Sequence, residues 1–202
     1  MITLLDYGAG NVRSVINAVE KLGGAVKIAS SPEDVIKAEK LIFPGVGSFG
    51  NMMHILQKKN YVDPLKTFLR SGRPFFGICL GMQALFESSE EAPGIDGLGI
   101  FAGRVKRFQI EKSVPHIGWN GIRIKKPSRI FNAAAGNEKF YFVHSYYVVP
   151  DNSDVTLTTT DYGLEFVSSV ASGNITGTQF HPEKSGEPGL ALLENFIADA
   201  GA

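Results

Sequence analysis

Short apolar runs alternate with amphipathic stretches through the first half of the chain. A right-handed βαβ chain produces this alternation, because buried strands are followed by helices that cover them. One stretch places Val15, Ile16, Val19 and Leu22 at helical spacing and stops at a glycine pair. The run before Cys79 is apolar without alternation, which is typical of a central strand covered on both faces. Strands are predicted over residues 2–7, 25–29, 40–43 and 73–78, and helices over residues 14–22, from residue 32, over 50–70 with an interruption at Pro64, and over 81–88.

The second half has a different pattern, in which predicted strands follow one another with turns between them. These strands cover residues 100–108, 118–124, 140–149, 155–160, 165–171 and 175–180, and a final helix covers residues 189–200. Without alternating helices, this half is predicted to be largely antiparallel. The fold class is therefore α/β: a doubly wound, mostly parallel sheet of flavodoxin-like type with an antiparallel β extension. The sequence contains no internal repeat or linker, so a single domain over residues 1–202 is expected.

Composition narrows the possible partners and cofactors. The chain has 20 Lys plus Arg and 20 Asp plus Glu, so no long-range field is expected to attract nucleic acid or an anionic membrane. No stretch reaches the roughly 18 apolar residues of a membrane span, and the apolar start is too short for a signal peptide. A single cysteine excludes an internal disulfide and a cysteine-based zinc site, so we expect a reducing cytoplasm and no metal. Gly8 and Gly10 lack the third glycine of a dinucleotide motif, and no cofactor is expected.

The one cysteine lies in the sequence Gly77-Ile78-Cys79-Leu80-Gly81, which has the form G-x-C-x-G at a strand-to-helix junction. This is the sulfur analogue of the nucleophile elbow, in which a reactive side chain stands on a strained turn at the edge of a sheet. Glycines on either side remove β-carbons that would collide with the neighbouring strand and helix. The start of a helix favours thiolate over thiol, and the Leu80 amide points where an oxyanion would form. A lone cysteine after an apolar strand is more often a small buried hydrophobe, so the motif alone leaves both interpretations open.

A histidine and a carboxylate follow the last predicted strand, at His181 and Glu183. Their spacing puts both side chains on one side of an extended backbone. Attack by cysteine on an amide needs a base that returns the thiol proton to the leaving ammonia, and a carboxylate that fixes the imidazole tautomer. Each residue alone is weak evidence, because such side chains are usually ordinary surface groups.

The segment Pro44-Gly45-Val46-Gly47 follows the third predicted strand. In a doubly wound sheet this strand is the neighbour of the cysteine's strand, and ligands collect at the carboxyl ends of both. The amides of Val46 and Gly47 are therefore candidates for an oxyanion hole, although a simple turn would explain the glycines equally well.

Taken together and in this order, these three motifs, the second extended by Met82 and Gln83, resemble the class I (triad) glutamine amidotransferases. Three further segments are similar to the glutaminase subunits of imidazole glycerol phosphate synthases, and the match covers essentially the full length: Asp6-Tyr7-Gly8-Ala9-Gly10-Asn11, Pro115-His116-Ile117-Gly118-Trp119-Asn120 and Tyr141-Phe142-Val143-His144-Ser145-Tyr146. The resemblance implies that Cys79 forms a thioester from the glutamine side chain and releases ammonia, with His181 as acid and base and Glu183 orienting it.

The resemblance also implies a glutamine pocket, an oxyanion hole and a protein partner. The glutamine pocket would be lined by Gly47, Gln83, Glu91, His144, Ser145 and Tyr146. The oxyanion would be held by the amides of Val46, Gly47 and Leu80. The partner would be a (β/α)8-barrel cyclase that uses the ammonia in histidine biosynthesis, and its interface would include Asn11, Trp119 and Lys184. Without the resemblance, Asn11 could equally be a helix cap, Trp119 a core aromatic and Lys184 a solvated charge.

A control mechanism follows from the glycines that flank Val46, because this peptide can rotate between orientations. We expect the isolated chain to be a poor glutaminase, and the partner with bound nucleotide to raise turnover by completing the oxyanion hole. A different triad amidotransferase subunit, such as those of anthranilate, aminodeoxychorismate or pyridoxal phosphate synthesis, would share the triad but not the run at 115–120. A flavodoxin-like binding protein with Cys79 as an oxidant sensor is the third interpretation, but it has no use for His181 and Glu183.

Overall fold

The computed structural model describes residues 1–8, 12–131 and 138–199. Five parallel strands form the centre of the larger sheet, in the order β2-β1-β3-β4-β13. Their bounds are β1 (Ile2–Leu5), β2 (Val26–Ala29), β3 (Lys40–Gly45), β4 (Phe75–Cys79) and β13 (Ile175–Thr178). The chain passes from β1 to β2 and then crosses to β3 on the other side of β1, so the sheet is doubly wound, as predicted.

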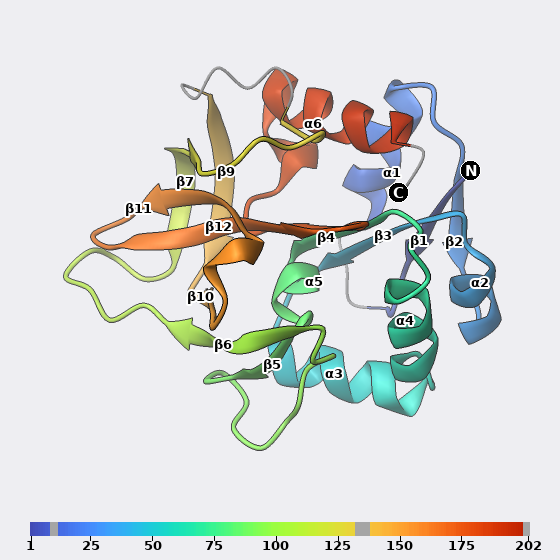
Figure 1. Cartoon of the computed structure of the whole chain (residues 1–202), viewed down its shortest axis with the longest axis horizontal. Coiled ribbons are helices and arrows are strands. Elements are labelled where there is room, and N and C mark those ends of the chain that lie inside the picture. The colour runs from blue at the N-terminus through green and yellow to red at the C-terminus, as the bar shows by residue number, and fades with distance from the viewer. Residues whose placement is uncertain (9–11, 132–137, 200–202) are drawn as a thin grey trace.

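Helices cover both faces of this central sheet (Figure 1). One face carries α1 (Val12–Lys21) and α6 (Gly186–Ala198); the other carries α2 (Pro32–Lys37), α3 (Phe49–Lys58) and α4 (Val62–Leu69), while the short α5 (Leu80–Gln83) follows β4. Successive side chains of β3 enter opposite cores, with Leu41 and Phe43 in one and Ile42 in the other. Full burial of a side chain such as Phe43 contributes roughly 1.5 to 3 kcal/mol. Burial on both faces explains the continuous apolar runs of the sequence.

Further strands extend the sheet beyond β13, in the order β13-β12-β10-β6-β5. The first three of these pairings are antiparallel, β5 and β6 are parallel, and β11 and β8 branch from β12. A second, two-stranded antiparallel sheet consists of β7 and β9. The bounds are β5 (Phe86–Ser89), β6 (Phe101–Arg107), β7 (His116–Gly121), β8 (Arg123–Ile124), β9 (Lys139–His144), β10 (Tyr146–Pro150), β11 (Thr156–Asp161) and β12 (Glu165–Ser172). This arrangement confirms the predicted α/β class with its antiparallel extension.

The helix predicted over residues 81–88 was wrong in its second half. Helix α5 is a single turn, and the chain then enters strand β5. The carbonyls of Ala84 and Leu85 accept hydrogen bonds from the amides of Leu98 and Ile100 rather than from a next helical turn. Tertiary pairing with a later segment therefore overrides the local helical pattern.

Two predicted strands are each divided in the structure. The strand predicted over 140–149 ends as β9 at His144 and restarts as β10 at Tyr146, with Ser145 between them. Strand β9 pairs with β7 in the small sheet, whereas β10 pairs with β6 and β12 in the large one. The strand predicted over 118–124 is likewise divided between β7 and β8. The apolar pattern is continuous across these breaks because both halves remain in sheets.

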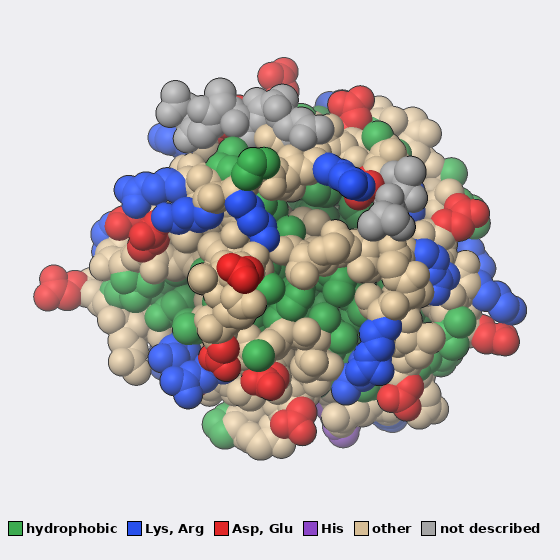
Figure 2. Space-filling view, viewed as in Figure 1, with side chains coloured by type: hydrophobic (Ala, Val, Ile, Leu, Met, Phe, Trp, Pro, Cys, Tyr) green, Lys and Arg blue, Asp and Glu red, His purple; other side chains and the backbone are tan. Residues whose placement is uncertain are grey.

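Charged side chains of both signs are interspersed around the face seen in Figure 2, and apolar side chains gather near its centre. Within the ranges that the structure describes, this face shows no large area of a single charge sign. No helix among the described residues is long and apolar enough to cross a membrane.

Candidate active site

The cysteine stands on a strained turn at the carboxyl edge of the central sheet. Cys79 is the last residue of β4 and has φ +55° and ψ −109°, a conformation that non-glycine residues rarely adopt. A β-carbon at Gly81 would lie 1.9 Å from the Phe43 carbonyl oxygen, and one at Gly77 would lie 2.8 Å from the Gly81 carbonyl oxygen. The turn can therefore form only with glycines on both sides, as the elbow motif predicts.

A pocket of about 830 Å³ opens beside Cys79. Its walls are Val46, Gly47, Cys79, Leu80, Gln83, Glu91, Pro115, Val143, His144, Ser145, Tyr146 and His181. The structure thus brings together the predicted nucleophile, the predicted base and all the residues predicted for the oxyanion hole and the glutamine pocket. Pro115 and Val143 were not predicted as pocket residues, although both lie within segments that carried the resemblance.

His181 and Glu183 form a buried pair behind the pocket. His181 Nδ1 lies 2.8 Å from Glu183 Oε1, and each side chain is 3% exposed. Burial lowers the pKa of His181, but the negative charge of Cys79 and the Glu183 carboxylate outweigh it and raise that pKa to about 10. Because Nδ1 is engaged by Glu183, the interaction of this imidazole with the Cys79 sulfur, which also raises its pKa, falls to the buried Nε2. This nitrogen is therefore available to exchange a proton in the pocket.

The sequence predicts an extended backbone between His181 and Glu183, but the backbone there is helical. A short 3-10 helix, η2, covers Pro182–Lys184. Pro182 fixes its first turn, and the His181 amide donates to the Tyr141 carbonyl at 2.9 Å. The pair is therefore assembled by a helical turn that folds Glu183 back toward the imidazole.

The predicted oxyanion segment lies directly beside the cysteine, because Gly45 pairs with Cys79 across β3 and β4. The Val46 amide, however, donates to the Tyr7 hydroxyl at 3.2 Å, and that hydroxyl donates to the Val46 carbonyl at 3.1 Å. Burial is the main cause that raises the pKa of Tyr7 to about 12, so the hydroxyl keeps its proton. In this conformation Val46 is held by Tyr7, and the other two predicted donors, Gly47 and Leu80, also line the pocket.

Two predicted glutamine contacts also bond within the protein. Gln83 Nε2 lies 3.1 Å from the Tyr146 carbonyl and 2.9 Å from Gln179 Oε1, which leaves the Gln83 oxygen for a ligand. Glu91 Oε2 accepts the Phe49 amide at 2.7 Å, at the start of α3. These contacts fix both side chains before any ligand binds.

His144 lines the pocket but offers no free nitrogen. Its Nδ1 lies 2.8 Å from the Tyr146 carbonyl and its Nε2 lies 3.1 Å from Nδ1 of His116. Since the carbonyl can only accept, His144 Nδ1 donates, and His116 then donates to His144 Nε2. Burial lowers the pKa of His144 to about 3 and that of His116 to about 4, so both rings are neutral. His144 therefore shapes the wall rather than offering a hydrogen bond to a ligand.

Two of the three predicted interface residues, Trp119 and Lys184, lie near one aromatic ring, that of Tyr141. Trp119 is 53% exposed, and its ring centroid lies 6.1 Å from that of Tyr141. Lys184 Nζ lies 6.0 Å from the Tyr141 centroid. Ile117, two residues before Trp119 on β7, is 60% exposed and was not predicted at the interface. Trp119 is thus a surface aromatic rather than a core residue, whereas Asn11 lies outside the described residues.

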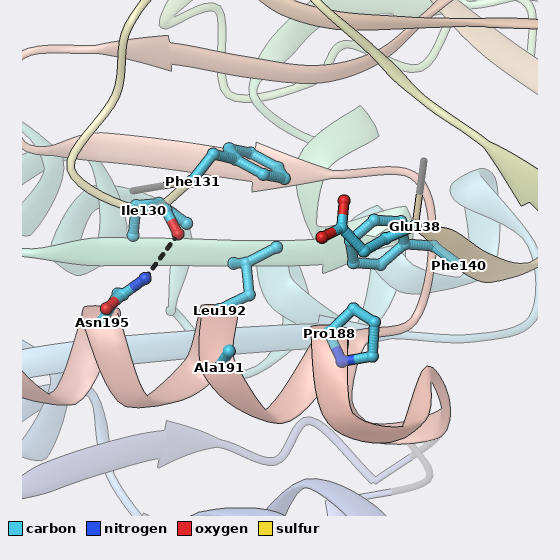
Figure 3. Close-up of a pocket in the computed structure, with 8 residues that line it drawn as sticks. All are labelled: Ile130, Phe131, Glu138, Phe140, Pro188, Ala191, Leu192 and Asn195. Atoms are coloured by element: carbon cyan, nitrogen blue, oxygen red, sulfur yellow. Dashed lines mark hydrogen bonds between the residues drawn. The ribbon is translucent and has the colours of Figure 1, made fainter. Parts of the chain in front are cut away.

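A second, smaller cavity of about 300 Å³ lies between α6 and the segments before and within β9 (Figure 3). Its lining residues are Ile130, Phe131, Glu138, Phe140, Pro188, Ala191, Leu192 and Asn195. Asn195 Nδ2 donates to the Ile130 carbonyl at 2.9 Å across one end. None of these eight residues is a cysteine or histidine, so the pocket at Cys79 remains the candidate active site.

The family model described as "Glutamine amidotransferase class-I" matches residues 3–200. The chain belongs to this family of amidotransferases. It is 46% identical to "Imidazole glycerol phosphate synthase subunit HisH" of Desulfitobacterium hafniense, over 97% of this chain and 93% of that protein. It is 47% identical to "Imidazole glycerol phosphate synthase hisHF, chloroplastic" of Arabidopsis thaliana, over 98% of this chain but only 34% of that longer protein. A solved structure described as "glutamine amidotransferase" has the same fold, with a TM-score of 0.76 at 21% identity, covering 96% of this chain and 98% of that one.

Proposed function

We propose that Cys79, His181 and Glu183 carry out the glutamine hydrolysis of this chain, which is the glutaminase subunit of an imidazole glycerol phosphate synthase. The observation that carries the assignment is the placement of His181. Its Nδ1 is held by Glu183 at 2.8 Å, while its buried Nε2 lies in the same pocket as Cys79 and is the ring nitrogen left to interact with that sulfur. An oxidant-sensing cysteine would not require this histidine and carboxylate.

The reaction runs in two halves. The Cys79 thiolate attacks the side-chain amide carbon of glutamine, and a C–S bond forms as the carbonyl oxygen becomes an oxyanion. His181 Nε2 then gives its proton to the amide nitrogen, the C–N bond breaks and ammonia leaves. His181 next takes a proton from water, which attacks the thioester and releases glutamate and the thiolate. Glu183 keeps the imidazole oriented and stabilises its charged form throughout.

The contact between Val46 and Tyr7 supports the expected dependence on a partner. The oxyanion hole uses the Leu80 amide and a second amide from Val46 or Gly47. While Val46 donates to Tyr7, its N–H is not available to the substrate. Rotation of this peptide on partner binding would complete the hole, so the isolated chain is a slow glutaminase.

The partner in this proposal is a (β/α)8-barrel cyclase subunit that receives the ammonia in histidine biosynthesis. Exposed Trp119 and half-buried Lys184, both against Tyr141, provide an aromatic and a cationic contact for it. Asn11 belongs to the same proposal. The glutaminase unit extends over residues 1–202 and works in the cytoplasm, where its single thiol stays reduced.

The test is ammonia release by wild type and Cys79→Ala, each with and without the barrel partner and its nucleotide. Wild type should release ammonia rapidly only in the complex. Cys79→Ala should lose about 10⁴- to 10⁶-fold in kcat, as other hydrolases do without their nucleophile, while still binding the partner. Equal rates from the two proteins would remove Cys79 as the nucleophile.

A further inference from the structure

A second polar side chain contacts the Cys79 sulfur. Gln179 follows β13 and is fully buried, with an exposed fraction of 0%. Its Nε2 lies 3.5 Å from Cys79 Sγ, and its Oε1 lies 2.9 Å from Gln83 Nε2. A buried amide is costly unless both ends are hydrogen-bonded. Here one of those two ends is assigned to the sulfur.

The direction of this contact can be derived from the surrounding atoms. The oxygen and nitrogen of an amide are distinguished only by their hydrogen-bond partners. The Tyr146 carbonyl can only accept, so the Gln83 atom at 3.1 Å from it is the nitrogen. That nitrogen also faces Gln179 at 2.9 Å, so the Gln179 atom there is the oxygen. The remaining end of Gln179, the N–H end, therefore points at the sulfur.

The Tyr146 carbonyl, where this series of hydrogen bonds begins, is itself fixed in position. The Tyr146 carbonyl also accepts His144 Nδ1 at 2.8 Å, and His144 is locked in that tautomer by His116. The carbonyl stands where β9 and β10 separate into two sheets, so the sheets on both sides hold it in place. A rigid carbonyl sets the orientation of two successive buried amides and hence the donor aimed at the nucleophile.

We propose that Gln179 is a catalytic residue whose side-chain N–H hydrogen-bonds the Cys79 sulfur and stabilises it as the thiolate. The bond favours the reactive form before attack, and it stabilises the same thiolate when the sulfur leaves the thioester. This proposal deepens the glutaminase assignment and rests on Cys79 being its nucleophile. A Gln179 with only a packing role would hold the strands together but would leave the reactivity of the sulfur unchanged.

Alkylation by iodoacetamide tests the proposal directly, because Cys79 is the one cysteine of the chain. In Gln179→Met the side chain keeps a similar length but loses the donor. Hydrogen bonds to charged groups are strong enough that the alkylation rate at pH 7 should fall about 10- to 100-fold. At high pH, where the thiol ionises without help, the two rates should converge. Thr176→Val, at a buried position on β13, which Gln179 directly follows, is the matched control and should react as wild type does.

The outcomes separate the possible explanations. An unchanged rate at pH 7, or a rate reduced equally at all pH values, would overturn the proposal, because the first means no stabilisation and the second means blocked access. If Gln179→Met does not fold, Gln83→Met provides the second variant, since it removes the group that orients Gln179 and should also slow alkylation at pH 7. Alkylation needs neither glutamine nor the partner. Fast, Gln179-dependent alkylation without glutamine hydrolysis in the complex would therefore refute the glutaminase assignment while leaving the Gln179 contact intact.

Discussion

His181 and His144 are both almost completely buried at the same pocket, yet the ring of His181 is charged and that of His144 is neutral. Burial lowers the pKa of each ring, and for His144 it prevails and brings the pKa to about 3. For His181, negative charge on Cys79 and Glu183 overcomes burial and brings the pKa to about 10. The bonding partners of His144 are a backbone carbonyl and the neutral ring of His116. The difference shows that the neighbours of a buried imidazole, rather than its burial, decide whether it can carry a proton.

The charged and the neutral imidazole suit different tasks. A charged imidazole beside a thiolate can deliver a proton to departing ammonia. A neutral imidazole with one fixed tautomer is a directional link, with a donor on one nitrogen and an acceptor on the other. The His144 side of the pocket therefore transmits orientation to Gln83 and Gln179, whereas the His181 side moves protons.

The largest expected effect comes from removing the carboxylate from the charged pair. Glu183→Gln keeps a polar atom near His181 Nδ1 but removes the negative charge, so the pKa of His181 should fall and the imidazole should lose its favoured tautomer. We expect kcat for glutamine in the complex to fall about 10²- to 10³-fold, with a much smaller change in KM. Steady-state ammonia release measures both constants.

Glu187→Gln is the matched control for this change, because Glu187 is an exposed glutamate four residues further along the chain. It should leave kcat within about twofold of wild type. A Glu183→Gln enzyme with normal kcat would mean that the carboxylate has no part in making His181 a proton carrier.

Much of the fold follows from the sequence because its pattern is repeated and strong. Parallel strands that are buried on both faces require continuous apolar runs, and this pattern located β3 and β4. The pattern failed where a distant segment provides the hydrogen-bond partners. At Ala84 and Leu85 the carbonyls bond to residues beyond Gly97, and a local helical pattern cannot include that information.

The candidate site also has a part that the sequence predicts and a part that it does not. Cys79 and its glycines, and His181 with Glu183, are local motifs, and the sequence was sufficient to propose them. The Tyr7 contact with Val46 and the Gln179 contact with Cys79 join residues that are far apart in sequence. They depend on the register of β1, β3, β4 and β13, which no local pattern specifies. Gln179 lies only two residues before His181, but its position gives no indication of which of its ends faces the sulfur.

The neutral pair formed by His144 and His116 should make the protein less stable in acid. For His144 the pKa is about 3 in the folded protein and 6.5 in the unfolded chain, so between pH 6.5 and about pH 3 the proton binds to the unfolded chain and not to the folded protein. Stability is therefore lost as pH falls from 6.5 toward 3. His144→Asn retains a donor for the Tyr146 carbonyl but removes this titration. Although the variant should be less stable overall, its unfolding free energy should depend less on pH by about 1.4 kcal/mol per pH unit.

Urea denaturation between pH 4 and pH 6.5 measures this slope. His54→Asn makes the same chemical change at an exposed position and should retain the wild-type slope. If His144→Asn also retained that slope, His144 would not be the group that resists protonation in the folded state.

The smallest expected effect comes from giving the neutral pair the carboxylate that it lacks. Asn120 Nδ2 lies 3.4 Å from His116 Nε2, so Asn120→Asp places a negative charge next to that ring. The pKa of His116, about 4 in the native pair, should rise by about one unit, because the new charge favours the imidazolium. NMR titration of the His116 ring measures this pKa. Asn152→Asp is the control: it adds the same charge at an exposed position elsewhere and should leave the pKa of His116 unchanged. If the pKa of His116 did not move, a neighbouring carboxylate would not be enough to charge a buried imidazole, and the high pKa of His181 would have to come from Cys79 rather than from Glu183.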